Sequence, residues 1–313
     1  MMLNPTNRWR LALLMCLGLV LVLGQVGCSL PQKVSDAWFD LMDSRDTNLR
    51  KRVVVAPFVS RFPHLQARAR AIGLAVAQRL EKQGGIVLVD FKLLQEALAK
   101  VDPAIKNNEE RIVAAAKTLG LNTVLSGALT NLALQYDKTG IYGFRENQPF
   151  ALLELNLRLI DVATGVLLAE GVQDAKFKLN DVEASNVTLG QPFPPKVVNQ
   201  LQADLVPPTV KWAGRNVAAQ AWTGFVLAVR DGQVQVTVGR DTGLSVGDQL
   251  VAYGRGTRIR SGGGRMLYLP GAAVGRLRLV KLDARSSWAV PVPEPGAKKK
   301  PGPFEPGQTL RTH

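Results

Sequence analysis

The chain offers few side chains that could carry out covalent chemistry. It contains two cysteines, Cys16 and Cys28, and two histidines, His64 and His313, the last of which ends the chain. A Ser-His-Asp triad needs a histidine to accept the proton of its serine, and only these two are available. No phosphate-binding loop ending in Gly-Lys-Ser/Thr occurs in the sequence. A nucleophilic hydrolase and a P-loop enzyme are therefore disfavoured.

Carboxylates are the remaining side chains that could do acid–base work. Asp90 and Glu154 are one pair that folding could bring together, as a glycosidase requires. Both lie at expected strand positions, where hydrophilic edges are common, so a structural role is favoured for each. The scarcity of cysteine and histidine excludes a thiol-based or histidine-rich metal site. We predict a protein that is not an enzyme and that uses no cofactor, metal or small-molecule substrate.

The first 28 residues are typical of a bacterial export signal. Arg8 and Arg10 precede residues 11–26, which carry no charge. This apolar run is shorter than the roughly 20 residues that a membrane-spanning helix needs. We therefore favour a signal peptide over residues 1–27 and disfavour a permanent membrane span.

Cys28 is the candidate lipidation site. Gly27 directly precedes it, as a small residue does in bacterial lipoprotein signals, whereas Gln25 stands where an aliphatic residue is usual. Several acyl chains on one residue anchor a protein stably, and a single chain does not. We expect an exported, periplasmic protein that is lipid-anchored, in our preferred hypothesis to the outer membrane, with a tether over residues 28–51. The alternative is an ordinary secretory signal in which Cys28 plays no part.

The overall charge constrains the kind of partner. The chain of 313 residues has a net charge of +14 with 46% hydrophobic and 20% charged residues, enough for two domains with apolar cores. Outside the cytoplasm, a basic protein is expected to meet anionic envelope components or an acidic partner. Lysine and arginine do not cluster with aromatic residues as in a nucleic-acid groove, so we predict no nucleic-acid partner. A dispersed charge that only aids solubility is the alternative.

Residues 52–180 have the pattern of a mixed-sheet α/β domain. The β-branched run that Pro57 ends predicts a buried strand. Apolar residues then recur at helical spacing, and Gly84-Gly85 and Gly120 are expected to end helices. The predicted order is strand, helix, strand, helix, helix, with elements at residues 53–58, 67–83, 86–89, 91–101 and 108–120.

The second half of this domain predicts antiparallel strands, at residues 123–135, 150–161 and 166–179. Leucines at every second position from Leu153 to Leu159 alternate with polar residues, which is typical of a strand with one buried and one wet face. Asp161 opens a tight turn and is expected to bond its own backbone rather than to act in catalysis. The loop over residues 136–148 is a candidate partner-binding surface, on which Tyr142, Phe144 and Arg145 would contact the partner. The alternative is a loop whose aromatic side chains pack against the protein itself.

The rest of the chain is read as a linker, a second domain and a tail. Residues 181–222 predict a linker with a helical segment between two proline pairs. Over residues 223–290, short strands with glycine turns, including Asp231-Gly232, predict a small all-β barrel, so the fold class is α+β. The glycine-rich basic loop of this barrel is a second candidate partner-binding surface, through Arg255, Arg258, Arg260 and Arg265. The Pro- and Gly-rich residues 291–313 are expected to be a disordered tail.

Three stretches of the first domain carry a resemblance. Residues 53–58, 119–127 and 157–165 resemble a group of bacterial envelope proteins that share a fold like the N-terminal domain of the Tol system's propeller protein. The group includes the middle domain of flagellar assembly protein T, the curli secretion lipoprotein and penicillin-binding-protein activators. The resemblance covers about residues 50 to 180 and implies a fold more than a function.

The barrel region resembles the C-terminal domain of flagellar assembly protein T, on Val238-Gly239, Gly243-Leu244, Gly247-Asp248 and Gly275. This resemblance implies an envelope lipoprotein that assists assembly or stability of the flagellar basal body, with basal-body or other envelope proteins as partners. The family's additional N-terminal domain has no counterpart in the short stretch before Val53. The alternative is an outer-membrane activator or secretion component of the penicillin-binding-protein-activator or curli type.

Overall fold

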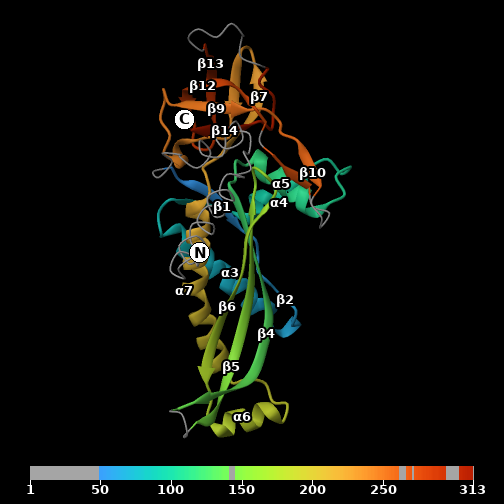
Figure 1. The fold of residues 1–313 in the computed structure, drawn as a ribbon, viewed down its shortest axis with the longest axis vertical. Helices are drawn as coiled ribbons and strands as arrows, with labels where there is room; N and C mark the ends of the chain where they lie inside the picture. Colours follow the sequence, from blue (N-terminus) through green and yellow to red (C-terminus); the bar gives the residue numbers. More distant parts are fainter. Residues whose placement is uncertain (1–48, 141–144, 261–265, 270, 294–302, 313) are drawn as a thin grey trace, which may run out of the picture. The chain divides into compact units, whose positions relative to one another are not determined.

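The computed structural model describes residues 49–140, 145–260, 266–269, 271–293 and 303–312. The export signal, Cys28 and nearly all of the expected tether therefore lie outside the described residues. The described chain forms a mixed α/β sheet with helices and a closed antiparallel barrel, so the fold class is α+β, as predicted (Figure 1).

The sheet combines a parallel half and an antiparallel half. Its strands lie in the order β3-β1-β4-β5-β6, and the short β2 pairs with β4. β1 is parallel to β3 and β4, whereas β5 pairs antiparallel with both β4 and β6. The strands are β1 (Lys51–Val55), β2 (Val59–Ser60), β3 (Ile86–Val89), β4 (Thr123–Thr139), β5 (Glu146–Asp161) and β6 (Leu167–Lys178).

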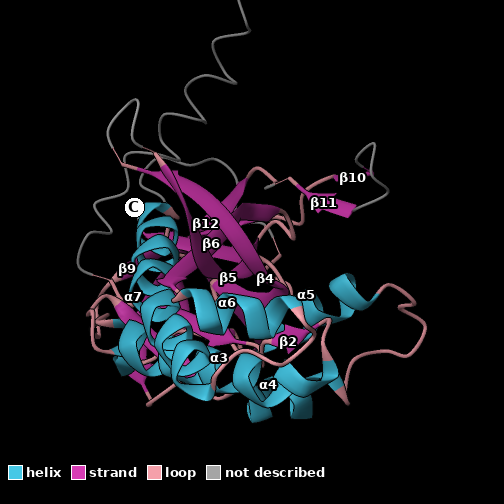
Figure 2. Ribbon diagram, turned by 90° about the horizontal axis from the view of Figure 1, so that it is seen from below, coloured by secondary structure: helices cyan, strands magenta, loops and turns pink. Residues whose placement is uncertain are grey.

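Helices supply a core on each face of the sheet. α3 and α7 lie side by side on one face of β4–β6 (Figure 2), whereas α4 and α5 pack against the other face of β1 and β4. β1 shows the expected alternation, because Val53 and Val55 belong to the first core and Val54 to the second. The helices of this part are η2 (Pro63–Leu65), α3 (Gln66–Glu81), α4 (Phe91–Leu98), α5 (Asn108–Thr118), α6 (Asp181–Thr188) and α7 (Pro195–Ala219).

β5 confirms the predicted leucine face. The four leucines are at most 2% exposed and pack in the core with α3 and α7, whereas Asn156 is half-buried on the opposite face. The alternation therefore identifies both the strand and its buried side. These leucines are Leu153, Leu155, Leu157 and Leu159.

The predicted loop over residues 136–148 is wrong. β4 continues to Thr139 and β5 already begins at Glu146, so the connection covers residues 140–145 only. Backbone N–H and C=O groups pair along a ladder whatever side chains it carries. The pairing of β4 with β5 therefore continues beyond the point where the apolar pattern ends.

Residues 195–219 form the 25-residue helix α7, where we expected a linker with a shorter helical segment between two proline pairs. Pro207 and Pro208 lie inside this helix instead of after its end. A proline inside a helix costs about 3 kcal/mol or more, but each fully buried Val or Leu contributes about 1.5–3 kcal/mol. Burial outweighs the two prolines, because α7 places these side chains in the core beside α3: Val197, Leu201, Leu205, Val206, Val210 and Val217. No helix among the described residues is long and apolar enough to cross a membrane.

The barrel closes in the order β12-β13-β8-β7-β14-β9. The Asp231-Gly232 turn between β7 and β8 has φ angles of 49° and 76°, as the hairpin prediction requires. A closed barrel leaves no unpaired edge. Its elements are β7 (Gly224–Arg230), β8 (Gln233–Val236), η3 (Arg240–Thr242), β9 (Gln249–Tyr253), β12 (Ala273–Leu282), β13 (Ser287–Val292) and β14 (Thr309–Thr312).

The prediction of a disordered tail is wrong for its last part. β14 lies between β7 and β9, and its Leu310 is 0% exposed in the barrel core. The prediction rests on the Pro- and Gly-rich composition of residues 291–313 as a whole, which does not show a strand of four residues. That strand is stabilised by pairing with β7 and β9, which are far away in the sequence. Residues 294–302, which include the three lysines of the tail, lie outside the described residues.

The basic loop of the barrel contains a hairpin. β10 (Arg258–Arg260) pairs antiparallel with β11 (Met266–Tyr268) as a separate two-stranded sheet. Tyr268 also donates its backbone N–H to the carbonyl oxygen of Thr164, 2.9 Å away, in the turn after β5. The region expected from sequence to be a glycine-rich basic loop therefore contains two paired strands.

Candidate docking groove between the sheet and the barrel

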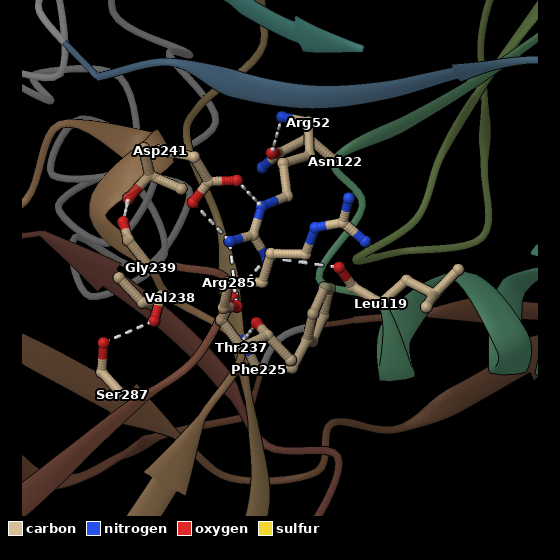
Figure 3. Close-up of polar contacts among 11 residues, drawn as sticks. Arg52, Leu119, Asn122, Phe225, Thr237, Val238, Gly239, Asp241, Arg285 and Ser287 are labelled. Atoms are coloured by element: carbon tan, nitrogen blue, oxygen red, sulfur yellow. Dashed lines mark hydrogen bonds and ion pairs between the residues drawn. The ribbon is translucent and has the colours of Figure 1, made fainter. Parts of the chain in front are cut away.

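Arg52 joins β1 to the barrel. The residue is 2% exposed, and its Nε and Nη2 donate to the two carboxylate oxygens of Asp241 at 2.8 and 2.6 Å (Figure 3). Nη1 donates to the carbonyl oxygens of Leu119, at 3.3 Å, and Thr237, and Nη2 donates to that of Arg285 at 2.9 Å. A buried guanidinium needs an acceptor for each of its five N–H groups, and each finds one here.

Asn122 and Gln220 make a second set of contacts beside Arg52. Asn122 Oδ1 accepts the backbone N–H of Arg52 at 2.9 Å, and its Nδ2 donates to the carbonyl oxygen of Thr223 at 2.9 Å, just before β7. Gln220, at the end of α7, donates to the carbonyl oxygen of Asn122 at 3.0 Å. We call Arg52, Asn122, Gln220, Thr223 and Asp241 the seam. The seam ties the sheet, the end of α7 and the barrel together.

Gly120 allows the end of α5 to approach the barrel. Its φ of +65° disfavours any other residue, and an added Cβ would lie 2.6 Å from Cβ of Thr237. A side chain here would strain the backbone and push the barrel away from β1. From sequence, Gly120 is expected only to end a helix; in the structure it also allows a close approach to the barrel.

A groove of about 290 Å³ lies beside the seam, between α5 and the barrel. Its walls come from α5, the turn after β5, the segment after β9, β11 and the chain that leads into β14. The lining side chains used below are Glu110, Lys117, Arg255, Tyr268 and Arg311. Five segments that are far apart in the sequence thus meet at one cavity.

Positive charge dominates the described lining of the groove. It holds the cations Lys117, Arg255 and Arg311 and one carboxylate, that of Glu110. Lys117 Nζ lies 4.6 Å from the ring centroid of Tyr268, a cation–π contact that holds the ammonium group at the wall. Cations gathered in a concavity with low-dielectric walls raise the local potential and attract anionic groups.

Arg255 is the exposed member of this set. Its side chain is 66% exposed, it donates from Nη2 to the carbonyl oxygen of Pro306 at 2.9 Å, and its Nε lies 3.8 Å from a carboxylate oxygen of Glu305. Ion pairs this exposed contribute little to stability. The planar guanidinium can therefore turn toward a carboxylate or phosphate of a partner without a large loss to the fold.

Of the predicted partner-binding residues, Arg255 is the one that the structure places in the groove. Arg258 and Arg260 lie on β10, but their side chains are outside the described part of the chain. Tyr142, Phe144 and Arg265 also lie outside the described residues, as does the lipidation site, Cys28.

Arg145 is exposed just before β5, at the strand end opposite Asp161. Asp161 accepts from the backbone N–H groups of Ala163 and Thr164, both at 3.2 Å, and so shapes the predicted turn, which borders the groove. Sixteen residues of strand span about 50 Å. The two predicted partner surfaces therefore do not converge.

Sequence reasoning missed Lys117, Tyr268 and Arg311. Lys117 follows a helical pattern and Arg311 sits in a segment judged to be disordered, so no local signal connected them to Arg255. Their meeting depends on the barrel closing through β14, which brings Arg311 to the groove. Among the described residues, no cluster of three or more His, Cys, Asp or Glu side chains could hold a metal ion.

Residues 243–247 match the Gly-x-Ser-x-Gly pattern of hydrolase nucleophiles, which sequence reasoning passed over. The structure places them between η3 and β9, where the backbone N–H of Ser245 donates to Asp248 at 2.8 Å. A nucleophile elbow instead joins a strand to a following helix. The match is therefore a turn that enters a barrel strand.

No known protein family and no curated protein sequence matches this chain. Among solved structures, protein CT253 from Chlamydia trachomatis is similar, with a TM-score of 0.37 and 13% identity over 55% of this chain and 99% of that chain. Lipoprotein GNA1162 from Neisseria meningitidis gives a TM-score of 0.28 and 16% identity over 49% of this chain and 99% of that one.

The C-terminal domain of LpoB from Escherichia coli gives a TM-score of 0.29 and 16% identity, over 45% of this chain and 93% of that chain. Scores and identities this low describe a distant likeness of the fold.

Proposed function

We propose that this chain is a non-enzymatic, lipid-anchored protein of the bacterial envelope that docks a partner protein in the groove. The observation that carries the proposal is the convergence of Lys117, Arg255 and Arg311, from three separate segments, on one cavity. Positioned cations beside apolar surface recognise a ligand without any reactive side chain. Val113, Leu269 and Pro306 supply that apolar surface in the lining.

The seam supports this proposal because it makes the groove preformed. Arg52 and Asn122 tie the sheet, which carries α5, to the barrel, which carries Arg255 and Arg311. A site whose parts are already in place loses less conformational entropy when a partner binds. Folding thus contributes directly to the affinity of the groove.

The chemistry of the groove favours an acidic partner. Three lining cations against one carboxylate match carboxylate side chains on an envelope protein. The net charge acts in the same direction over a longer range: it is +14 for the full sequence and 14 − 2 = +12 once Arg8 and Arg10 leave with the export signal. In this proposal the export signal and the lipidated Cys28 hold the protein at a membrane surface outside the cytoplasm, so it binds its partner there. For the partner's identity we propose the flagellar basal body, following the resemblance to flagellar assembly protein T.

The test is a strain that carries Arg255→Ser together with Arg311→Ser in the full-length chain. We expect reduced swimming motility and fewer assembled flagella, because two of the three cations that hold the acidic partner are gone. The control is Arg240→Ser together with Arg278→Ser, which removes the same charge from exposed barrel positions outside the groove. Melting temperatures of the three purified chains, the wild type and the two double variants, separate lost binding from lost folding.

Each outcome has a distinct meaning. Normal motility of the groove variant at normal stability contradicts the flagellar assignment. If that variant instead becomes sensitive to cell-wall antibiotics, the penicillin-binding-protein-activator alternative takes its place. Equal defects in the groove variant and the control remove the groove from the function, since general charge then explains the effect.

A further inference from the structure

Strand β6 ends the sheet with an edge that no other described strand pairs with. It is 12 residues long and pairs with β5 alone. The opposite edge, β3, has four residues, and the barrel is closed. Long edge strands present unpaired N–H and C=O groups to other chains, whereas short edges and closed barrels do not. Among the described strands of the sheet and barrel, β6 is thus the place for strand addition.

The two faces of β6 differ. Ala169, Gly171 and Ala175 are paired with buried leucines of β5 and lie under α7, where a Cβ on Gly171 would be 2.7 Å from Nε1 of Trp212. The alternate residues lie on the open face and are exposed, and they carry charges of both signs around one valine. They are Glu170, Val172, Asp174, Lys176 and Lys178.

We propose that β6 pairs antiparallel with β6 of a second copy of this chain, so that one sheet continues through both copies. A two-fold axis at Gln173 pairs residues 168–178 of the two strands, nearly the whole of β6. In this register Glu170 stands opposite Lys176 of the partner subunit, and the symmetry repeats the pair. Opposite charges directly across an antiparallel pair stabilise it.

Neighbouring registers are worse for electrostatic reasons. An axis at Val172 sets Glu170 opposite Asp174 of the partner subunit. An axis at Asp174 sets Asp174 opposite Asp174 of the partner subunit. Like charges in these positions destabilise a sheet. An axis at residue 175 again matches opposite charges but pairs only residues 172–178, because β6 ends at Lys178.

On the helix-covered face, this register sets Gly171 opposite Ala175 of the partner subunit, so small side chains meet there. A two-fold axis perpendicular to the sheet keeps both copies of α7 on the same face, and directly paired residues then have side chains on the same face. The axis therefore passes through a residue, and the charges on the open face select Gln173 over its neighbours.

Disulfide trapping in intact cells tests the pairing in the full-length chain. With the axis at Gln173, two Gln173→Cys copies stand directly opposite each other, within reach of a disulfide after mild oxidation. We expect a covalent dimer on non-reducing gels. Leu189→Cys is the control, because Leu189 is 78% exposed at the end of α6 and is not part of strand β6. Dimer yields that are equal for both variants would overturn the proposal.

Charge reversal within the Gln173→Cys chain identifies the register. Lys176→Glu turns two attractive pairs into two repulsive ones, so the dimer should weaken by about tenfold or more. Adding Glu170→Lys should restore it, since the charges are then exchanged and again opposite. Lys178→Glu makes the same charge change on the same face opposite Leu168 and should have little effect.

Melting temperatures accompany these variants, because both charges have a partner within their own chain: Lys176 contacts Asp137 at 2.9 Å and Glu170 lies 3.9 Å from Arg158. If Lys176→Glu does not fold, Glu170→Lys alone must show the same loss of dimer. A folded double variant that fails to regain the dimer, or a Lys178→Glu variant that loses it equally, would contradict the proposed register.

Discussion

Arg52 combines nearly complete burial with a permanent positive charge. Removing a guanidinium from water costs several kcal/mol, which its partners must offset. Asp241 neutralises the charge through two bonds, and three carbonyl oxygens accept the remaining N–H groups. Every N–H group of Arg52 therefore has a hydrogen-bond acceptor, and the loss of any one of these partners should lower the stability of the fold.

Arg52→Ala should lower the free energy of unfolding by about 3–5 kcal/mol, because it removes a buried, fully hydrogen-bonded guanidinium and leaves the partly buried carboxylate of Asp241 without its cation. Urea unfolding of the purified chain measures this change. Arg50→Ala is the matched control, since Arg50 is exposed and makes one side-chain bond, of 3.3 Å, to the carbonyl oxygen of Ile86. It should change stability by no more than about 0.5 kcal/mol. Equal effects of the two variants would contradict the role of the seam.

At the scale of elements, strand β5 is built around a row of three paired residues. Leu157 stands between Gly127 of β4 and Gly171 of β6. Both glycines leave space for rings, because a Cβ there would lie 2.8 Å from Phe58 and 2.7 Å from Trp212, respectively. The two aromatic rings thus flank Leu157 across the sheet, which explains its complete burial.

Leu157→Ala should cost about 2–5 kcal/mol, because the side chain is fully buried and the neighbouring rings cannot collapse fully into the space it leaves. Asn156→Ala, one residue away on the open face, should change stability by no more than about 0.5 kcal/mol. Thermal unfolding of both variants gives the comparison. Similar melting temperatures for the two would show that the buried face of β5 is assigned wrongly.

At the scale of the whole molecule, the proposed activity combines an anchor and a preformed docking body. The described residues begin at Leu49, which packs against the barrel core, and Lys51 donates to the carbonyl oxygens of Val217 and Ala218 near the end of α7. The chain therefore enters the folded part close to the seam. In the proposed function, Cys28 holds this body at the membrane.

Cys28→Ala should release the protein from membranes into the soluble periplasmic fraction, because acylation needs the thiol. The measurement is the share of full-length protein that sediments with membranes after cell disruption. Cys16→Ala is the control, since Cys16 lies in the predicted signal peptide and its replacement should leave sedimentation unchanged. Unchanged sedimentation of the Cys28→Ala protein would contradict lipid anchoring.

Much of the local structure of the sheet domain and of the barrel follows from the nearby sequence. The helices, the leucine face of β5, the Asp161 turn and the Asp231-Gly232 hairpin all depend on spacing or on φ angles that a few adjacent residues decide. A period in the sequence shows which side of an element is buried. It does not show what buries that side, so α7 was mistaken for part of a linker although its apolar stripe is visible.

Tertiary structure alone decided the groove and the seam. Leu310 belongs to a strand because it pairs with Gly224 of β7 on one side and with Ala252 of β9 on the other. The sequence of the tail contains no signal for these distant partners. Arg52 is buried because Asp241 and three carbonyl oxygens converge on it from several segments. Local sequence determines how each segment folds and which face is apolar. Closing the barrel against the sheet determines which charges meet, because that depends on contacts between residues far apart in the chain.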